Sequence, residues 1–161
     1  MSPFRIGHGF DVHKYSAEDK PLLLAGVDVH PTMGVEAHSD GDVLLHSLCD
    51  ALLGSVALRD IGYHFPDTDV SNKNKDSAFF TGEILKKVQK KGYKIGNIDI
   101  TVIAQEPKLL TYIPKMVGSL AKILSIGEND INIKATTTER LGFIGRVEGI
   151  SVHSVVLVYQ C

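Results

Sequence analysis

Hydrophobic and polar residues alternate with the two-residue period of a β-strand in several parts of the chain. The segments with this pattern are residues 5–12, which Gly7 and Gly9 interrupt, and residues 98–104, 131–137 and 147–159. The mostly apolar run 22–29, which ends before Pro31, predicts one further strand.

Three other segments repeat apolar residues every three or four positions, as helices do. They are residues 42–53, opened by Asp40 and closed near Gly54; residues 77–91, with Ser77 as N-cap and Gly92 at the end; and residues 113–126, stopped by Gly127. The polar stretch 59–75 predicts a loop. Because strands and helices alternate only in part, we expect an α+β fold: a single-domain sandwich, spanning residues 1–161, of one mixed β-sheet with helices on one face.

Composition narrows the class of protein. A chain of 161 residues fits one domain. Its 17 Lys and Arg against 19 Asp and Glu give a formal net charge of −2, which argues against a nucleic-acid partner. No apolar run approaches the ~20 residues of a membrane span, so we expect no membrane partner. With only Cys49 and Cys161 and no signal-peptide pattern, we expect a reducing compartment and no structural disulfide.

Three residues form a candidate metal site. Asp11 and His13 lie two positions apart in a predicted strand, so both side chains point to the same face. On the next predicted helix, His46 lies with Asp42 and Asp50 on the side opposite the leucines. Either of these aspartates is placed to accept the outer imidazole N–H of His46, which would fix the tautomer of the ring.

These residue types leave two interpretations open. One carboxylate and two imidazoles suit zinc, with a fourth position left for substrate. A structural zinc site would need a fourth ligand, usually a cysteine, and neither cysteine of this chain is placed to supply it. The alternative is that His46 is an ordinary solvated or core histidine.

Two polar segments are candidates for binding phosphate or a second metal ion. Residues 38–42, just before the first predicted helix, offer hydroxyl, imidazole and backbone N–H donors, although helix capping by Asp40 or Ser39 explains them equally. Residues 135–140 carry consecutive threonines, a carboxylate suited to Mg²⁺ and a cation. Threonine is also a good strand former, so an ordinary strand edge is the alternative here.

Five groups of residues stand out when the segments are taken together in chain order. They are RIGHGFDVH at residues 5–13, AHSDGD at 37–42 with His46, DIG at 60–62 with FPDTD at 65–69, AQ at 104–105 with PK at 107–108, and KATTTE at 134–139 with LGF at 141–143. In this order and spacing they resemble the 2-C-methyl-D-erythritol 2,4-cyclodiphosphate synthases of non-mevalonate isoprenoid biosynthesis. The resemblance covers almost the whole chain.

The resemblance implies a metal-dependent phosphorus–oxygen lyase. The family converts 4-diphosphocytidyl-2-C-methyl-D-erythritol 2-phosphate to 2-C-methyl-D-erythritol 2,4-cyclodiphosphate, as the 2-phosphate oxygen attacks the β-phosphorus and CMP departs. In such an intramolecular phosphoryl transfer the enzyme mainly positions groups and neutralises charge, so no protein nucleophile is expected. The resemblance also implies a homotrimer with active sites between subunits.

By residue match, Asp11, His13 and His46 hold Zn²⁺, and Glu139 holds Mg²⁺ or Mn²⁺ between the α- and β-phosphates. The matching catalytic residues are Glu139 and the two transition-state stabilisers His38 and Thr137. The resemblance further implies a substrate-binding set: Asp11, Val12, His13, His38 and Ser39; Asp60, Ile61, Gly62, Phe65, Pro66, Asp67, Thr68 and Asp69 for methylerythritol; Ala104, Gln105, Glu106, Pro107, Lys108, Leu109 and Leu110 for the cytidine part, from the neighbouring chain; and Thr136, Thr137, Thr138 and Glu139. Without the resemblance, residues 60–69 would be an ordinary solvated turn.

Phe143 and Arg146 match residues that line a central cavity on the trimer axis, where the family can hold an isoprenoid diphosphate. His153 departs from the family pattern, because some members carry glutamate there. Three imidazoles near the axis would make occupancy of the cavity sensitive to pH around 6.5, where histidine ordinarily titrates. The alternative is a neutral, packed histidine.

Two other functions are compatible with these residues. One is a trimeric ligand-binding module that has lost catalysis, although His38, Thr137, Glu139 and Lys108 are all present. The other is a zinc phosphohydrolase, because a zinc site with an open position also activates water. The resemblance places the protein in a bacterial cytoplasm or in a plastid-type organelle.

Overall fold

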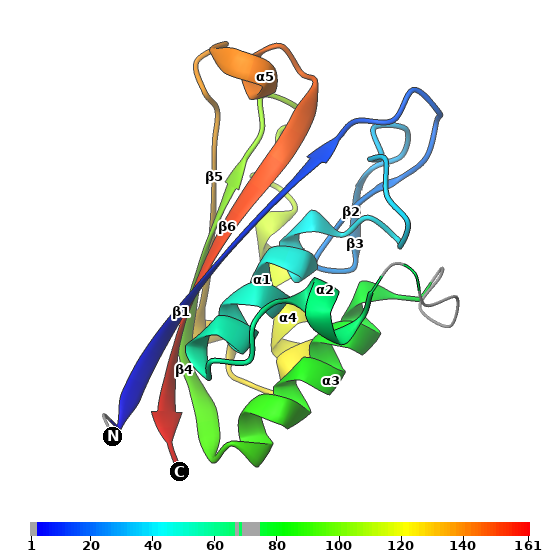
Figure 1. Cartoon of the computed structure of the whole chain (residues 1–161). Coiled ribbons are helices and arrows are strands. Elements are labelled where there is room, and N and C mark those ends of the chain that lie inside the picture. Colours follow the sequence, from blue (N-terminus) through cyan, green and yellow to red (C-terminus); the bar gives the residue numbers. More distant parts are fainter. Residues whose placement is uncertain (1–2, 67, 69–74) are drawn as a thin grey trace.

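The computed structural model describes residues 3–66, 68 and 75–161, and its centre is a four-stranded sheet (Figure 1). The strands are β1 (Phe4–Lys14), β4 (Tyr93–Ile103), β5 (Ile131–Thr136) and β6 (Gly149–Gln160), in the spatial order β1-β6-β4-β5. Strand β6 runs antiparallel to β1 and to β4, whereas β4 and β5 are parallel. The sheet is therefore mixed.

Helices cover one face of this sheet (Figure 1). They are α1 (Val43–Ser55), α3 (Ser77–Lys90) and α4 (Ile113–Leu124), accompanied by the short helices α2 (Ile61–His64) and α5 (Gly142–Gly145) and the 3-10 turn η2 (Glu128–Asp130). The predicted α+β fold, with a mixed sheet and helices on one face, is confirmed. In the described part of the chain, every helix is too short or too polar to span a bilayer.

The prediction of a single strand over residues 22–29 is wrong. The chain forms a hairpin there, with β2 (Leu22–Leu24) and β3 (Val27–His30) pairing antiparallel. Ala25 and Gly26 turn the chain, and both have positive φ angles, of 55° and 72°. Because the turn lies inside an apolar run and only one of its residues is glycine, the hydrophobic pattern does not reveal it.

Most other predicted elements differ from the structure by one or two residues at their ends, and three further differences are larger or change a role. Strand β4 begins at Tyr93 rather than at residue 98, because an irregularity in its pairing with β6 between Ile95 and Asn97 interrupts the two-residue period. The predicted loop 59–75 contains helix α2. The N-cap of α3 is Asp76, whose carboxylate accepts from the backbone N–H of Ala78, and not Ser77.

Helix α1 is enclosed on nearly all sides. Most of its residues are buried, and the less buried His46, Asp50 and Gly54 follow one another at four-residue spacing along one side. The helix reaches β1 closely because the strand offers glycines there: a Cβ added to Gly7 or Gly9 would lie 1.8 Å from a backbone carbonyl oxygen of α1. The glycines that interrupt the strand pattern thus allow α1 and β1 to meet.

The opposite face of the sheet lies away from α1, α3 and α4 (Figure 1). Large apolar side chains of β1 and β6 are exposed on it: Phe4, Ile6, Phe10, Val12, Val155 and Tyr159. Monomeric proteins rarely expose a continuous apolar surface of this kind, and such surfaces usually mark an interaction site. We call this set the outer apolar face.

Candidate active site

Strand β1 and helix α1 bring the three predicted metal ligands together. Asp11 and His13 alternate on β1, and His46 faces them from α1. The Oδ2 atom of Asp11 lies 2.9 Å from Nε2 of His13 and 3.3 Å from Nδ1 of His46, and these two nitrogens are 3.4 Å apart. Ligand atoms around a tetrahedral ion with bonds of about 2.0–2.1 Å lie roughly 3.3 Å apart. The cluster has the dimensions of a zinc site.

The hydrogen bonds of His13 orient its ring for a metal. Its Nδ1 atom lies 3.1 Å from the backbone carbonyl of Glu36, which only accepts, so Nδ1 carries the proton and Nε2 faces Asp11. Burial would raise the pKa of Asp11, but the hydrogen bonds with His13 and His46 outweigh it and lower that pKa to about 2. Burial would lower the pKa of His13, but the hydrogen bond with Asp11 outweighs it and raises that pKa.

The predicted partner of the outer nitrogen of His46 is wrong. Asp42 is fully buried and caps α1, and its carboxylate accepts from the backbone N–H groups of Leu45, Ala25 and Gly26. As an N-cap it turns away from the side chains of the helix that follows. Burial raises the pKa of Asp42 to about 6.

Asp50, the other predicted partner of His46, accepts from the backbone N–H of Ile61. The outer nitrogen of His46, Nε2, instead lies 2.9 Å from Oγ of Ser77, the first residue of α3, and 3.3 Å from Oγ of Ser39. Ser77 contacts Asp40 in turn. The sequence predicted Ser77 only as a helix cap. Its contact with His46 was not predicted, because the two residues are distant in the chain.

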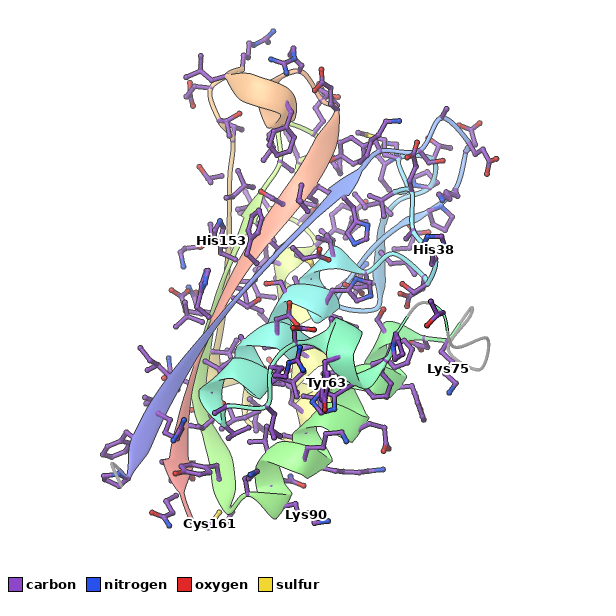
Figure 2. All side chains as sticks on the ribbon, viewed as in Figure 1. His38, Tyr63, Lys75, Lys90, His153 and Cys161 are labelled. Carbon is purple, nitrogen blue, oxygen red and sulfur yellow. The ribbon has the colours of Figure 1, made fainter. Side chains whose placement is uncertain are left out.

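The segment before α1 carries His38 and Ser39 beside the cluster. His38 is exposed, and Figure 2 shows it on the loop that leads into α1. It contributes to an open pocket of about 540 Å³ that Ser16, Ala17, Glu18, Lys20, Glu36 and Ala37 also line. Neither Asp40 nor Ser39 is the cap of α1, which is Asp42.

The threonine-rich segment forms a turn at the end of β5. The hydroxyl of Thr137 donates to Oε1 of Glu139 over 3.1 Å and accepts from its backbone N–H over 3.2 Å. Thr138 donates to the backbone carbonyl of Leu141 over 2.7 Å. Thr136, Thr137 and Glu139 are exposed, so their oxygens face solvent.

The predicted cytidine segment, residues 104–110, lies beside this turn. The backbone N–H of Ala104 donates to the carbonyl of Thr136 over 3.0 Å, and the side chain of Gln105 accepts from the N–H of Arg140 over 3.1 Å. Tyr15 donates to the carbonyl of Glu106 over 2.6 Å. The other members differ in exposure: Lys108 and Leu110 are exposed, Pro107 is half-buried and Leu109 is buried.

The ligand cluster, formed by Asp11, His13 and His46, and the turn that carries Glu139 lie apart within one chain. Across the sheet, Asp11 pairs with Val152, Val152 with Val102, and Val102 with Ala135. Three strand spacings separate the backbones of Asp11 and Ala135, which is roughly 14 Å. Among the described residues, Glu139 does not belong to the ligand cluster, whose atoms all lie within 4.8 Å of one another. Within one chain, Asp11, His13 and His46 therefore form one group and the Glu139 turn forms another.

The predicted methylerythritol segment lies next to α1 through helix α2. Asp60 caps α2 by accepting from the backbone N–H of Tyr63 over 2.9 Å, and Ile61 is held by Asp50. The ring of Phe65 packs 4.6 Å from that of Phe80. The remaining predicted residues fall into two groups: Gly62, Pro66 and Thr68 are exposed, whereas Asp67 and Asp69 lie outside the described residues.

Comparison with known proteins identifies the family. The model of the YgbB family matches residues 4–159. The 2-C-methyl-D-erythritol 2,4-cyclodiphosphate synthase of Francisella philomiragia is 59% identical over 155 residues, which are 96% of this chain and 98% of that protein. This chain belongs to the YgbB family of cyclodiphosphate synthases. The family and the synthase function inferred from the five sequence motifs are confirmed.

Solved structures of cyclodiphosphate synthases share the fold. The bifunctional IspDF of Campylobacter jejuni is 51% identical with a TM-score of 0.95, and the match covers 98% of this chain and 42% of that one. The IspF of Plasmodium falciparum in its CDP complex is 36% identical with a TM-score of 0.87, covering 99% of this chain and 98% of that one.

The residues predicted to line the central cavity of the synthase lie away from the metal-ligand cluster. Arg146 forms an ion pair with Glu148 over 2.8 Å, and Phe143 is exposed on α5. His153 lies on the outer side of β6 (Figure 2), where its Nδ1 atom is 2.9 Å from Nε2 of His8 and its ring is 4.7 Å from that of Phe10. His153 therefore borders the outer apolar face.

Proposed function

We propose that this chain cyclises 4-diphosphocytidyl-2-C-methyl-D-erythritol 2-phosphate to 2-C-methyl-D-erythritol 2,4-cyclodiphosphate and CMP, as a phosphorus–oxygen lyase. An oxygen of the 2-phosphate bonds to the β-phosphorus, the bond from that phosphorus to the bridging oxygen breaks, and CMP leaves with that oxygen. The single observation that carries the proposal is the cluster of Asp11, His13 and His46, in a chain that is 59% identical to a named cyclodiphosphate synthase.

Asp11, His13 and His46 would hold Zn²⁺, because their donor atoms have the spacing of tetrahedral ligands. Glu139, with an exposed carboxylate, would hold Mg²⁺ or Mn²⁺. Bound metal ions neutralise phosphate charge and polarise phosphoryl oxygens. The protein orients each of these three side chains, either through a hydrogen bond to the side chain or through its position on a strand.

The remaining site residues would bind and orient the substrate. His38 and Ser39 offer an imidazole and a hydroxyl beside the cluster, and Thr136 and Thr137 offer hydroxyls beside Glu139. Thr138 completes that turn through its bond to Leu141. With His38 and Thr137 as transition-state stabilisers, the charge that develops at the β-phosphate meets preorganised donors. The methylerythritol contacts come from residues 60–62 and 65–69, and Val12 lies between the metal ligands on β1.

The protein is a homotrimer in this proposal, with each active site between two subunits. One observation supports it from the fold: the backbones of Asp11 and of Ala135, which leads into the Glu139 turn, lie roughly 14 Å apart across one sheet, and this separation favours a site that two chains complete around one diphosphate. The outer apolar face supplies a surface for packing against other copies. Residues 104–110 and the adjoining Glu139 turn would both come from the neighbouring subunit.

The trimer axis would enclose a cavity for an isoprenoid diphosphate, lined by Phe143 and Arg146. His153 would make its occupancy depend on pH, because a protonated imidazole attracts a diphosphate and a neutral one does not. The charged and titratable groups that share its face include His8 on β1, Asp99 on β4 and Lys134 on β5, the last two paired with each other, and, farther along the strands, Lys14 and Lys94. Greater affinity for the diphosphate at acid pH supports this role, and a flat pH profile contradicts it.

The product distinguishes this proposal from its rivals. Incubation of the chain with the cytidine substrate, Zn²⁺ and Mg²⁺ is expected to release CMP and a cyclic diphosphate in equal amounts. Release of inorganic phosphate would indicate a zinc phosphohydrolase, and binding without turnover would indicate a ligand-binding module. The bacterial source of curated relatives such as the two Francisella synthases supports a bacterial cytoplasm rather than a plastid-type organelle.

A further inference from the structure

The outer nitrogen of His46 meets a buried hydroxyl from another helix. Oγ of Ser77 lies 2.9 Å from Nε2 of His46, while Nδ1 of the same ring faces Asp11 and His13. Ser77 is fully buried at the start of α3. Asp76 caps that helix, so the hydroxyl of Ser77 is not needed for capping and is left for the ring.

The contacts of Asp40 set the direction of this hydrogen bond. Its Oδ2 accepts from the backbone N–H of Ser77 over 2.9 Å, and its Oδ1 accepts from the backbone N–H of Asp42 over 3.2 Å and from the hydroxyl of Ser77. A carboxylate only accepts. The hydroxyl proton of Ser77 is therefore given to Asp40, and the lone pair of its oxygen faces His46.

When Nδ1 of His46 binds an ion, the proton of the ring lies on Nε2. An N–H at that position donates to the Ser77 oxygen, and the lone pair of Nδ1 is left facing Asp11 Oδ2 and His13 Nε2. Ser39 lies farther from Nε2, at 3.3 Å, and its oxygen also accepts from the backbone N–H of Gly41. The Ser77 contact is the shorter of the two, and the Ser77 hydroxyl also bonds to the charged carboxylate of Asp40.

We propose that Ser77 and Asp40 are positioning residues of the metal centre. Together they hold the His46 ring in the orientation and tautomer that present Nδ1 to the ion. Hydrogen bonds of this kind to a ligating histidine fix the ring and raise its basicity, and their loss typically costs about 10- to 100-fold in metal affinity. The inference rests on the proposed zinc site, and it adds residues from α3 and from the loop before α1 to that site.

The same contacts connect metal binding with substrate binding. Asp40 lies in the segment that carries His38 and Ser39, and both of its oxygens bond to the first residue of α3. Ser77 therefore holds both the ring of His46 and the loop that carries His38 and Ser39. We expect a substitution at Ser77 to make the ring and the loop less well ordered.

The test measures zinc affinity of the metal-free chain by competition with a chromophoric chelator. Ser77→Ala is expected to weaken Zn²⁺ binding by about 10- to 100-fold, and Ser77→Thr, which restores a hydroxyl, is expected to recover most of it. The matched control is Thr81→Val, which removes another buried hydroxyl one turn along α3, where it bonds to Ser77 carbonyl and Cys49. Thr81→Val should bind Zn²⁺ as the parent does.

A second measurement reads the hydrogen bond directly. In imidazole nitrogen NMR spectra of the zinc-loaded chain, His46 is expected in the Nε2–H form with that proton protected from exchange with water, and Ser77→Ala should speed the exchange. Asp40→Asn serves where Ser77→Ala does not fold. The neutral amide replaces one of the two acceptor oxygens by a donor, so Asp40→Asn breaks part of the bonding to Ser77 and weakens the hydrogen bond between Ser77 and the Nε2–H of His46.

The outcomes separate this inference from the proposed function. If the parent chain binds no Zn²⁺, the proposed metal site is wrong. If the parent binds Zn²⁺ but Ser77→Ala and Asp40→Asn bind it equally well with an unchanged His46 spectrum, the positioning role is wrong and the metal site stands.

Discussion

A Cβ on Gly9 would lie 1.8 Å from the carbonyl oxygen of Ser47, the residue that follows His46. This approach sets the distance between β1, which carries Asp11 and His13, and the helix that carries His46. No side chain fits there without moving the backbone of α1. The absence of a side chain at position 9 is thus a condition for the metal-ligand cluster.

Gly9→Ala is therefore expected to lower the free energy of unfolding by about 3 kcal/mol or more, because the added methyl group overpacks a rigid backbone contact. Urea denaturation of the metal-free chain measures this. The control is Gly54→Ala on α1, the helix that faces Gly9. A Cβ on Gly54 would come no closer than 4.0 Å to the nearest neighbouring atom, the carbonyl oxygen of His8. Gly54→Ala should stabilise the chain by about 0.5–1 kcal/mol. Equal effects of the two substitutions would contradict the packing argument.

His46→Ala is expected to abolish turnover and to weaken zinc binding beyond the roughly 100-fold loss expected from a missing supporting hydrogen bond. The variant removes one of three protein ligands, and its fold should persist because His46 lies on the less buried side of α1. The control His30→Ala changes a histidine on β3 whose ring accepts from the backbone N–H of Thr32 in its own turn. Bound zinc, counted per chain after dialysis, should be lost only from the first variant; full activity of His46→Ala without bound zinc would refute the ligand role.

Glu139→Gln is expected to lower kcat and to raise the Mg²⁺ concentration needed for half-maximal activity by roughly tenfold, because a neutral amide binds a hard divalent ion more weakly than a carboxylate does. Zinc content should not change, because Glu139 is not part of the ligand cluster. Glu128→Gln, at an exposed position on η2, is the control. An unchanged Mg²⁺ titration of Glu139→Gln would count against the second metal site.

Mixed trimers test whether each active site uses two chains. His46→Ala and Glu139→Gln chains are each expected to have little activity alone. Unfolded together in equal amounts and refolded, they should recover about a quarter of the parental activity, because that share of random subunit contacts joins two intact half-sites. No recovery after confirmed trimer exchange would mean that one chain supplies both halves.

Much of the fold could be predicted because the core elements keep their hydrophobic period. Helix α1 combines buried leucines with His46, Asp50 and Gly54 at four-residue spacing, so the sequence predicts which side of the helix is buried. The hairpin at Leu22–His30 was missed because its turn begins with Ala25, an apolar residue in a left-handed conformation. The start of β4 was missed because the irregularity near Asn97 breaks the alternation.

The cluster of Asp11, His13 and His46 could be predicted because Asp11 and His13 lie two positions apart on one strand and the motifs match a known family. The hydrogen-bond partner of the outer nitrogen of His46 could not be predicted, because it depends on which helix packs against α1. Helical spacing placed Asp42 and Asp50 near the ring, but backbone N–H groups occupy both carboxylates. Ser77 is brought to the ring only by tertiary packing, 31 residues farther along the chain.

The most direct test is a crystal of the chain with CDP and Zn²⁺, measured on both sides of the zinc absorption edge. An anomalous peak about 2.0–2.2 Å from Asp11 Oδ2, His13 Nε2 and His46 Nδ1, with a diphosphate oxygen as the fourth ligand, is the predicted result. A zinc peak elsewhere, or a diphosphate bound out of reach of these three atoms, would contradict the account.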